Sequence, residues 1–144
     1  MILYFVFILI LQPCIITKSH SKSIITTLPG YSGHLPFNLE TSYVGIGDIQ
    51  LFYYFVESTR NPEEDPLILH ISGGPGCSGL LPLLGETGMS KQYMANMIYV
   101  DMPVGSGFSY AETEQGWISS DTITATQATE FIKKVKVTFN YYSC

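Results

Sequence analysis

Residues 66–80 read Pro66-Leu67-Ile68-Leu69-His70-Ile71-Ser72-Gly73-Gly74-Pro75-Gly76-Cys77-Ser78-Gly79-Leu80. The run Leu67–Ile71 is apolar and is bounded by a proline and a cluster of glycines, so it predicts a buried strand. The glycines carry no side chain where the backbone must turn, which leaves N–H groups open to an outside atom. In α/β proteins, a strand followed by such a turn is typical of sites for anions or developing oxyanions at the carboxyl edge of the sheet.

The spacing of the glycines leaves three interpretations open. The first is a dinucleotide site, because Gly74–Gly79 has the spacing G-x-G-x-x-G and Asp101 follows about 20 residues later, behind another apolar run. Pro82 and Gly85 oppose it, since they shorten or break the helix that such a site needs. The second interpretation is an oxyanion turn, and the third is tight packing alone. A phosphate loop is excluded, because no Lys-Ser or Lys-Thr pair follows the glycines.

Two apolar segments ahead of this stretch predict a hairpin. Phe37–Val44 and Ile49–Val56 are rich in aromatic and β-branched residues, and the glycines of a turn lie between them. The second segment is apolar on both faces, so we expect a sheet that is covered on both sides. The flanking residues 21–33 and 57–65 predict polar loops, and the acidic residues 63–65 predict a solvated surface turn.

A second strand and turn follow the glycine-rich stretch. Met97–Val100 predicts another buried strand, and Val104–Tyr110 forms a second glycine-rich turn behind it. Two such turns after two apolar strands predict parallel neighbours with both turns at one edge of the sheet. Ser119 or Ser120 is then expected to cap a helix whose last turns carry lysines, as suits the helix dipole. Its apolar face comprises Ile123, Ala128, Phe131, Ile132 and Val135.

Composition and the first residues indicate a secreted protein. The 144-residue chain has a net charge of −5 and only seven Lys plus Arg, which argues against nucleic acid as a partner. The apolar run Met1–Leu11 is shorter than the roughly 20 residues that span a bilayer, so no stable membrane span is expected. Residues 1–21 predict a signal peptide cleaved near Ser21, which leaves one modest domain over residues 22–144. We expect the secretory pathway, with an extracellular or vacuolar destination.

Residues Ser72–Gly79 resemble the signature of the serine carboxypeptidase family, peptidase family S10, and especially its plant carboxypeptidase-like branch. Several further segments resemble that family in the same order along most of the chain. These segments are Leu28-Pro29-Gly30, Gly33-His34-Leu35-Pro36, Leu51–Phe55, Asn61-Pro62, Asp65-Pro66-Leu67 and Ala95–Tyr110. This resemblance favours the oxyanion turn over the dinucleotide loop.

The resemblance implies an α/β-hydrolase fold with a catalytic Ser, Asp and His in that chain order, and no metal or cofactor. The N–H of Gly74 then falls in the oxyanion hole, while Ser72 and Gly73 bind the terminal carboxylate of the substrate. Cys77 matches a position that forms a disulfide with a cysteine much further along in full-length relatives. Partners implied by the family are a peptide C-terminus or an acyl-glucose, and no oligomeric state is predicted.

Ser72 departs from the pattern of true carboxypeptidases, which usually carry Asn at this position. A hydroxyl still donates to a carboxylate, but its reach differs from that of an amide. A serine here is similar to the plant acyltransferase relatives, which move acyl groups from glucose esters. This one position favours acyl transfer over peptide hydrolysis.

The catalytic triad is missing from residues 1–144. No serine lies in a Gly-x-Ser-x-Gly elbow, which exposes the nucleophile in this fold. The histidines His20, His34 and His70 all precede the place where an elbow would lie. We therefore expect the N-terminal strands and first helices of an incomplete α/β-hydrolase fold, without catalysis as this chain. The alternatives are a non-catalytic truncated paralogue, an incomplete gene product, or a dinucleotide-binding fragment.

Overall fold

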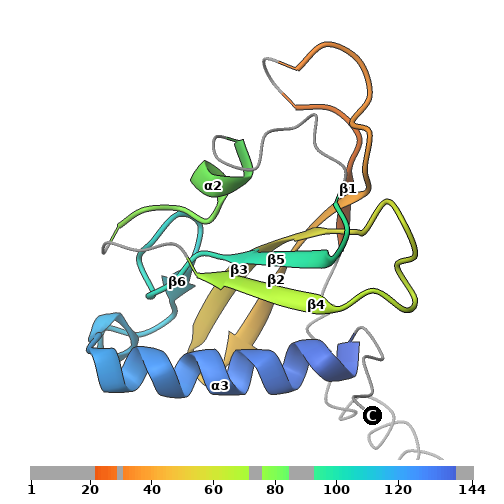
Figure 1. Cartoon of the computed structure of the whole chain (residues 1–144). Helices are drawn as coiled ribbons and strands as arrows, with labels where there is room; N and C mark the ends of the chain where they lie inside the picture. The colour runs from red at the N-terminus through yellow and green to blue at the C-terminus, as the bar shows by residue number, and fades with distance from the viewer. Residues whose placement is uncertain (1–21, 29–30, 72–75, 85–92, 139–144) are drawn as a thin grey trace, which may run out of the picture.

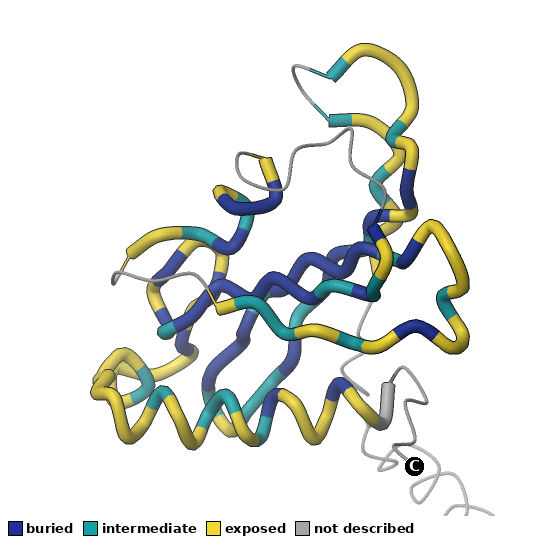
Figure 2. Tube along the Cα trace, viewed as in Figure 1, coloured by how far each residue is buried: buried dark blue, intermediate teal, exposed yellow. Residues whose placement is uncertain are grey.

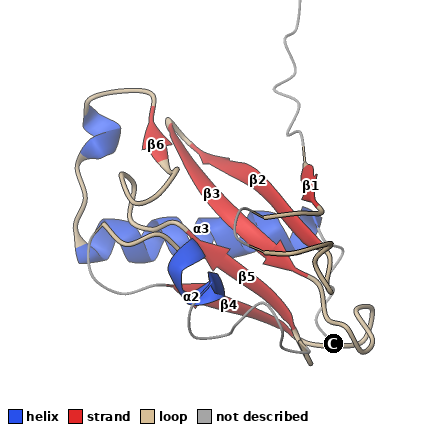
Figure 3. Cartoon of the chain, turned by 90° about the horizontal axis from the view of Figure 1, so that it is seen from above, coloured by secondary structure: helices blue, strands red, loops and turns tan. Residues whose placement is uncertain are grey.

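The computed structural model describes residues 22–28, 31–71, 76–84 and 93–138. Its elements are β1 (Ser23–Ile25), β2 (Leu39–Ile46), β3 (Ile49–Val56), β4 (Leu67–Ile71), α2 (Leu80–Leu84), β5 (Asn96–Val100), β6 (Tyr110–Ala111), the short turn η1 (Gln115–Trp117) and α3 (Asp121–Thr138). The strands form one six-stranded sheet in the order β1-β2-β3-β5-β4, with β6 paired to β3. Helix α3 lies across one face of the sheet and α2 lies over the other (Figures 1 and 3).

The predicted hairpin is confirmed as β2 and β3. The two strands pair antiparallel from Leu39↔Val56 to Ile46↔Ile49, and the turn contains Gly47 with a φ of 61°. The first strand begins two residues later than predicted, at Leu39, and continues through Gly45 to Ile46. A positive φ favours glycine because it carries no Cβ to clash with the backbone, so Gly47 allows this short turn.

The predicted parallel pair is confirmed as β4 and β5, which run side by side from Leu67↔Asn96 to Ile71↔Val100. The prediction that the first of them is buried is wrong. Strand β4 is the last in the strand order within the described residues, and Ile68 and Ile71 are 45% and 46% exposed. Figure 2 shows this contrast between the exposed β4 and the buried β5 and β3. An apolar run therefore identified the strand but not its position in the sheet.

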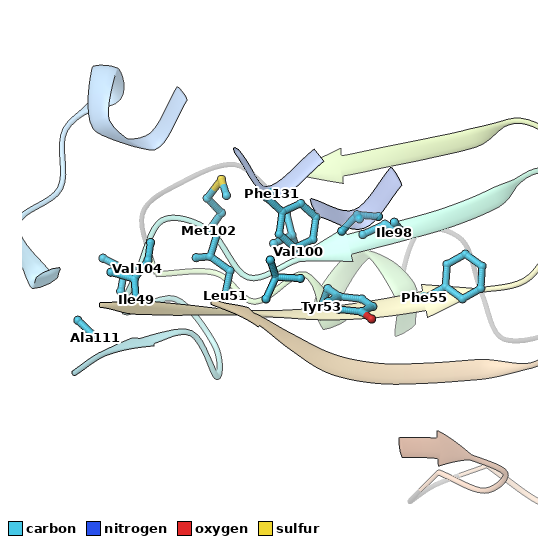
Figure 4. Packing of buried hydrophobic residues seen from close by; sticks show 12 residues of the cluster. Ile49, Leu51, Tyr53, Phe55, Ile98, Val100, Met102, Val104, Ala111 and Phe131 are labelled. Atoms are coloured by element: carbon cyan, nitrogen blue, oxygen red, sulfur yellow. The ribbon is translucent and has the colours of Figure 1, made fainter. Parts of the chain in front are cut away.

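Two apolar clusters fill the faces of the sheet, as the two-sided pattern of β3 predicts. On the α3 side, Phe131 and Val135 pack with side chains of β3 and β5 such as Tyr53 and Val100 (Figure 4). On the α2 side, Leu83 belongs to a cluster of side chains from the loop and strands, comprising Phe37, Leu39, Tyr54, Val56, Leu83, Tyr93 and Tyr99. Burial of these side chains is the main force that holds the layers together.

The prediction of a capped helix after Ser120 is confirmed. The Ser120 hydroxyl accepts the Ile123 N–H at 3.3 Å, and Asp121 lies in the first turn. The predicted apolar face is only partly covered, because Ile123 and Ile132 remain exposed while Phe131 is buried. None of the helices in the described part of the chain combines the length and the apolar character needed to cross a membrane.

The prediction of a polar loop over residues 21–33 is wrong for Ser23–Ile25, which form β1 and pair antiparallel with β2. Ile25 packs against the cluster on the α2 side, although Ile24 beside it is exposed. Three residues are too few to show an alternating pattern in the sequence. The backbone pairing offered by β2 therefore decides the conformation here.

Candidate functional site

The predicted oxyanion and carboxylate residues Ser72, Gly73 and Gly74 lie outside the described residues. What the structure describes is the strand that leads to them and the backbone that follows them. Strand β4 ends at Ile71, and the chain is described again from Gly76, which has a φ of 98°. The candidate site is therefore defined by its two flanks.

The downstream flank, Gly76–Gly79, runs into α2 at the carboxyl end of the parallel strands (Figures 1 and 3). Ser78 begins the helix, because its hydroxyl accepts the Leu80 N–H and its carbonyl accepts the Leu81 N–H, both at 3.1 Å. Cys77 is exposed, and it forms no disulfide within the part of the chain that the structure describes. Its disulfide with a distant cysteine stays a prediction.

A buried carboxylate, that of Asp101, holds this flank in place. Its Oδ1 accepts the Ser78 hydroxyl at 2.8 Å and the Gly79 N–H at 2.6 Å. Its Oδ2 accepts the Phe108 N–H at 2.8 Å. Asp101 follows directly after β5, so one side chain joins the turn that follows β4 to the turn that follows β5.

Two glycines let the backbone approach this carboxylate. A Cβ at Gly107 would lie 2.0 Å from Asp101 Oδ2, and the residue has a φ of 51°. A Cβ at Gly79 would lie 3.1 Å from the carbonyl oxygen of Val100. Tight packing therefore accounts for Gly79, where the packing interpretation of the first glycine cluster holds, and it also accounts for Gly107 in the second turn.

The backbone of Asp101 is fixed to β3 on both sides. Its N–H donates to the Phe52 carbonyl at 2.9 Å, and its own carbonyl accepts the Ser109 hydroxyl at 2.6 Å. The Ser109 hydroxyl oxygen in turn accepts the Phe52 N–H at 2.8 Å. These three hydrogen bonds hold the start of the second turn against the centre of the sheet.

Tyr54 lies beside the same group on the α2 face. Burial raises the pKa of Tyr54 to about 12, the negative charge of Asp101 adds to the increase, and interaction with the Ser78 hydroxyl opposes it. The phenol is therefore neutral at physiological pH and available as a hydrogen-bond donor next to the glycine turn.

Aromatic rings extend from Tyr54 along this face to the second turn. Phe52 makes edge-to-face contacts with Tyr43, Tyr54 and Phe108, at centroid distances of 4.8, 5.1 and 5.3 Å. Tyr43 also contacts Tyr110 at 5.6 Å. Phe108 is 60% exposed. The face next to the candidate site thus presents an aromatic surface.

The structure gives Asp101 a different role from the one that the dinucleotide interpretation assigns. That interpretation needs an accessible carboxylate for a ribose hydroxyl and a helix that follows the glycines. Asp101 is instead fully buried with three protein donors, and α2 has only five residues with Pro82 inside it. Both observations oppose a dinucleotide site.

Sequence reasoning missed Asp101 as the residue that organises the site. A usable signal was present, since an acidic residue directly after an apolar strand and before a glycine-rich turn is placed to accept backbone N–H groups. The prediction that both glycine turns lie at one edge is confirmed, because Gly79 and Phe108 donate to the same carboxylate.

Neither histidine in the described residues forms a catalytic pair. His34 is exposed, and His70 packs against the Tyr99 ring at a centroid distance of 5.3 Å. Neither donates to or accepts from a serine in the described part of the chain. His20 lies outside it. Among the described residues, the structure therefore shows the two flanks of the candidate site and no histidine paired with a serine there.

The fold and the site define an α/β protein in which Ser78 and Gly79 are anchored at the carboxyl edge of a mixed sheet. Comparison with known proteins adds the family: the serine carboxypeptidase profile matches residues 29–143. The chain belongs to the serine carboxypeptidase family, peptidase family S10. This is an α/β-hydrolase family, and the mixed sheet is compatible with part of that fold.

Relatives in Arabidopsis thaliana support the same assignment. Serine carboxypeptidase-like 13 and Serine carboxypeptidase-like 10 are each 47% identical to the chain, over 89% and 88% of its length. Serine carboxypeptidase-like 2 is 44% identical over 88% of the chain. The aligned segments cover 35%, 34% and 34% of these relatives, so the chain spans about a third of their length.

Proposed function

We propose that residues 72–79 form the oxyanion-binding and carboxylate-binding turn of a serine-type acyl-transfer enzyme. The observation that supports this most is the anchoring of Ser78 and Gly79 by a buried carboxylate at the carboxyl end of β4. An oxyanion site works because its donors are already in position when charge develops on the substrate. The charge-assisted hydrogen bonds of Ser78 and Gly79 hold the described end of the turn in place, which supports this requirement for the proposed donors that precede it.

In this proposal the three residues that precede Pro75 each have one role. The Gly74 N–H donates to the oxygen that becomes negative when the acyl carbonyl is attacked. The Ser72 hydroxyl and the Gly73 N–H bind a carboxylate of the substrate. Removal of one oxyanion donor costs about 10²–10³ in rate in enzymes of this type, so Gly74 carries a substantial part of the rate enhancement.

The substrate class follows from the same turn. A peptide C-terminus and an acyl-glucose both present an acyl carbonyl, and they differ in the group that leaves. Only the peptide has a terminal carboxylate for Ser72 and Gly73 to bind, and with an acyl-glucose the same two donors would face hydroxyls of the leaving sugar. Ser72 in place of Asn favours the acyl-glucose substrate and transfer of the acyl group to an acceptor. The assay described below distinguishes this acyl transfer from hydrolysis at a peptide C-terminus.

Residues 1–144 on their own are proposed to lack turnover. Activation of a serine needs a base next to it, and an oxyanion hole without that pair retains only residual catalysis over water. Purified chain treated with a serine-directed fluorophosphonate should remain unlabelled, as judged by intact mass. Stoichiometric labelling of one serine would contradict the proposal.

Carboxylate binding by the turn can be tested without turnover. We expect N-benzoyl-phenylalanine to shift the backbone NMR signals of residues 72–79, whereas its C-terminal amide shifts them less. Ser72→Ala should weaken the response to the acid, and Ser119→Ala, an exposed serine in the loop before α3, should leave it unchanged. Equal responses to acid and amide, or no effect of Ser72→Ala, would contradict the assignment.

The leaving group is tested in a protein expressed from the complete transcript. Sequencing of the transcript beyond the codon for Cys144 first shows whether a Gly-x-Ser-x-Gly elbow follows. With such an elbow present, we expect acyl transfer from a glucose ester to exceed peptide hydrolysis, and Ser72→Asn to shift the balance toward hydrolysis. Predominant release of C-terminal amino acids would instead assign carboxypeptidase activity.

Localisation is proposed from the first 21 residues. We expect removal of residues 1–21 in the secretory pathway, followed by delivery to the extracellular space or the vacuole. N-terminal sequencing of chain expressed in plant cells should give a first residue near Lys22. A mature chain that still begins at Met1 would contradict this part of the proposal.

A further inference from the structure

We propose that Asp101 is a positioning residue that couples the glycine turn after β4 to the glycine-rich turn after β5, so that a change in either turn is transmitted to the other. The inference rests on the proposed function for its consequence, because the first turn is the proposed oxyanion site. The coupling itself rests on geometry alone.

Each oxygen of the Asp101 carboxylate accepts hydrogen bonds from a different turn. Oδ1 serves the first turn through Ser78 and Gly79, at 2.8 and 2.6 Å, and Oδ2 serves the second turn through Phe108 at 2.8 Å. A carboxylate is planar and rigid, so a displacement of one oxygen displaces the other. Each donor is an uncharged N–H or O–H, and each hydrogen bond to the charged acceptor is stronger than a neutral one.

The backbone of Asp101 is held in place by hydrogen bonds. The N–H and carbonyl of Asp101 are both fixed next to Phe52 on the central strand β3, the carbonyl through the Ser109 hydroxyl. The side chain can therefore relieve a disturbance only by rotation, which breaks contacts in both turns. Asp101 is fully buried, so loss of a protein donor would leave a buried charge less well satisfied.

A substitution at Gly107, in the second turn, can test whether a change there reaches Gly79 in the first turn. A methyl group at this position would lie 2.0 Å from Oδ2 and would push the carboxylate away, yet Gly107 makes none of the three hydrogen bonds itself. Residue 107 lies in the second turn, and Gly79 lies in the first. An effect of Gly107→Ala on the Gly79 amide would therefore have to pass through Asp101.

The experiment is NMR on the 144-residue chain, with hydrogen exchange and the proton shift of two amides, Gly79 and Phe108. In the unchanged chain both amides should be protected and shifted downfield by the charged acceptor. Asp101→Asn should accelerate exchange at both by about tenfold or more, the range expected for loss of a hydrogen bond to a charge. Gly107→Ala should reproduce the change at Gly79.

A purely structural role for Asp101 would look different. Asp65→Asn removes another buried carboxylate and controls for general destabilisation, so it should leave exchange at Gly79 unchanged relative to Ile98 in β5. Ser78→Ala removes one donor and should alter Gly79 more than Phe108. Should Asp101→Asn fail to fold, Gly107→Ala and the unchanged chain still decide the question.

Two results would overturn the coupling. The first is a Gly79 amide that exchanges in the unchanged chain as fast as an unstructured amide. The second is a Gly107→Ala chain in which Gly79 keeps its shift and its protection relative to Ile98. Because the readout involves no turnover or ligand, failure of the coupling leaves the acyl-transfer proposal to its own assays, and failure of those assays leaves the coupling intact.

Discussion

Two buried carboxylates lie at opposite ends of the parallel strands β4 and β5, Asp65 at the amino end and Asp101 at the carboxyl end. They accept hydrogen bonds from different kinds of donor. Asp65 precedes β4 and accepts hydrogen bonds from Ser58, from the guanidinium of Arg60 and from the Asn61 N–H. These donors to its carboxylate lie within seven residues of it in sequence. The prediction that Asp65 belongs to a solvated acidic turn is therefore wrong, because Ser58 and Arg60 bring it inward.

Among the described residues, the donors to the Asp101 carboxylate are all uncharged. Two of them, Ser78 and Gly79, lie 23 and 22 residues away in sequence. The comparison teaches that a carboxylate neutralised by a neighbouring cation fixes its own loop. A carboxylate surrounded by N–H and O–H groups of distant segments fixes those segments to each other.

Asn96 extends the local network at the Asp65 edge. Its side chain accepts the Ser58 N–H at 3.0 Å and donates to the carbonyls of Pro62 at 2.9 Å and Asp65 at 3.1 Å. This joins the loop before β4 to the first residue of β5. The amino edge of the strand pair is thus closed by a structural network, while the carboxyl edge carries the glycine turn.

Gly107→Ala should have the largest effect on stability. The added methyl group displaces the Asp101 carboxylate and forces an alanine into a left-handed conformation, so we expect the free energy of unfolding to fall by about 3 kcal/mol. Gly47→Ala is the matched control, since its φ of 61° imposes similar strain with nothing within 4 Å of the new Cβ. It should cost about 1 kcal/mol in urea unfolding. Equal losses would show that the carboxylate is not displaced.

Asp65→Asn should have the next largest effect, and it should depend on pH. Hydrogen bonds from Arg60, first, and from Ser58 hold the pKa of Asp65 well below its ordinary value near 3.8. A lowered pKa stabilises the fold fully above that ordinary value, and the stabilisation is lost as pH falls toward the folded pKa. The variant should therefore lose stability at pH 7 and show a flatter decline below about pH 4.

Urea unfolding at a series of pH values measures this effect. Glu64→Gln is the control in the same loop, because Glu64 is exposed. If the stability of Asp65→Asn falls with decreasing pH as steeply as that of the unchanged chain, the acid sensitivity does not come from Asp65.

Ser78→Ala should cost less, about 1 kcal/mol, because it removes one hydrogen bond to Asp101 and the acceptor of the Leu80 N–H while the Gly79 contact remains. Thermal or urea unfolding measures the loss, and Ser119→Ala, an exposed serine, should be nearly neutral. A loss as large as that of Gly107→Ala would show that Ser78 is the main anchor of the turn.

Added salt should have the smallest effect and should act at one carboxylate only. Raising NaCl from about 0.1 M to about 1 M shortens the Debye length from about 10 Å to about 3 Å. Because the Arg60 side chain is 63% exposed, the penalty of Asp65→Asn should shrink with salt. The penalty of Asp101→Asn should stay constant, since its donors are uncharged and the carboxylate itself is fully buried. A parallel response of both variants would contradict the distinction between them.

Local patterns in the sequence predict most of the elements that surround the site. The hairpin, the parallel pair and the capped helix follow from apolar runs, glycines and Ser120, which act over a few neighbouring residues. The family resemblance, carried by Ser72–Gly79 and the segments around it, is confirmed by the profile match and the Arabidopsis relatives.

What the sequence does not predict depends on contacts between distant segments. The exposure of Ile68 is set by the place of β4 in the strand order, and the burial of Asp65 by the positions of Arg60 and Asn96. The role of Asp101 required the knowledge that Gly79 and Gly107 meet at one carboxylate. The roles of Ser72, Gly73 and Gly74 stay predictions, because these residues lie outside the described part of the chain.

The place of β4 in the sheet has a geometric consequence for assembly of a complete catalytic centre. Its free side, within the described residues, presents a row of N–H and C=O groups spaced for one more partner. A segment that paired there in the same direction as β4 would have its carboxyl end beside that of β4. The described sheet thus has room for one further parallel strand next to β4.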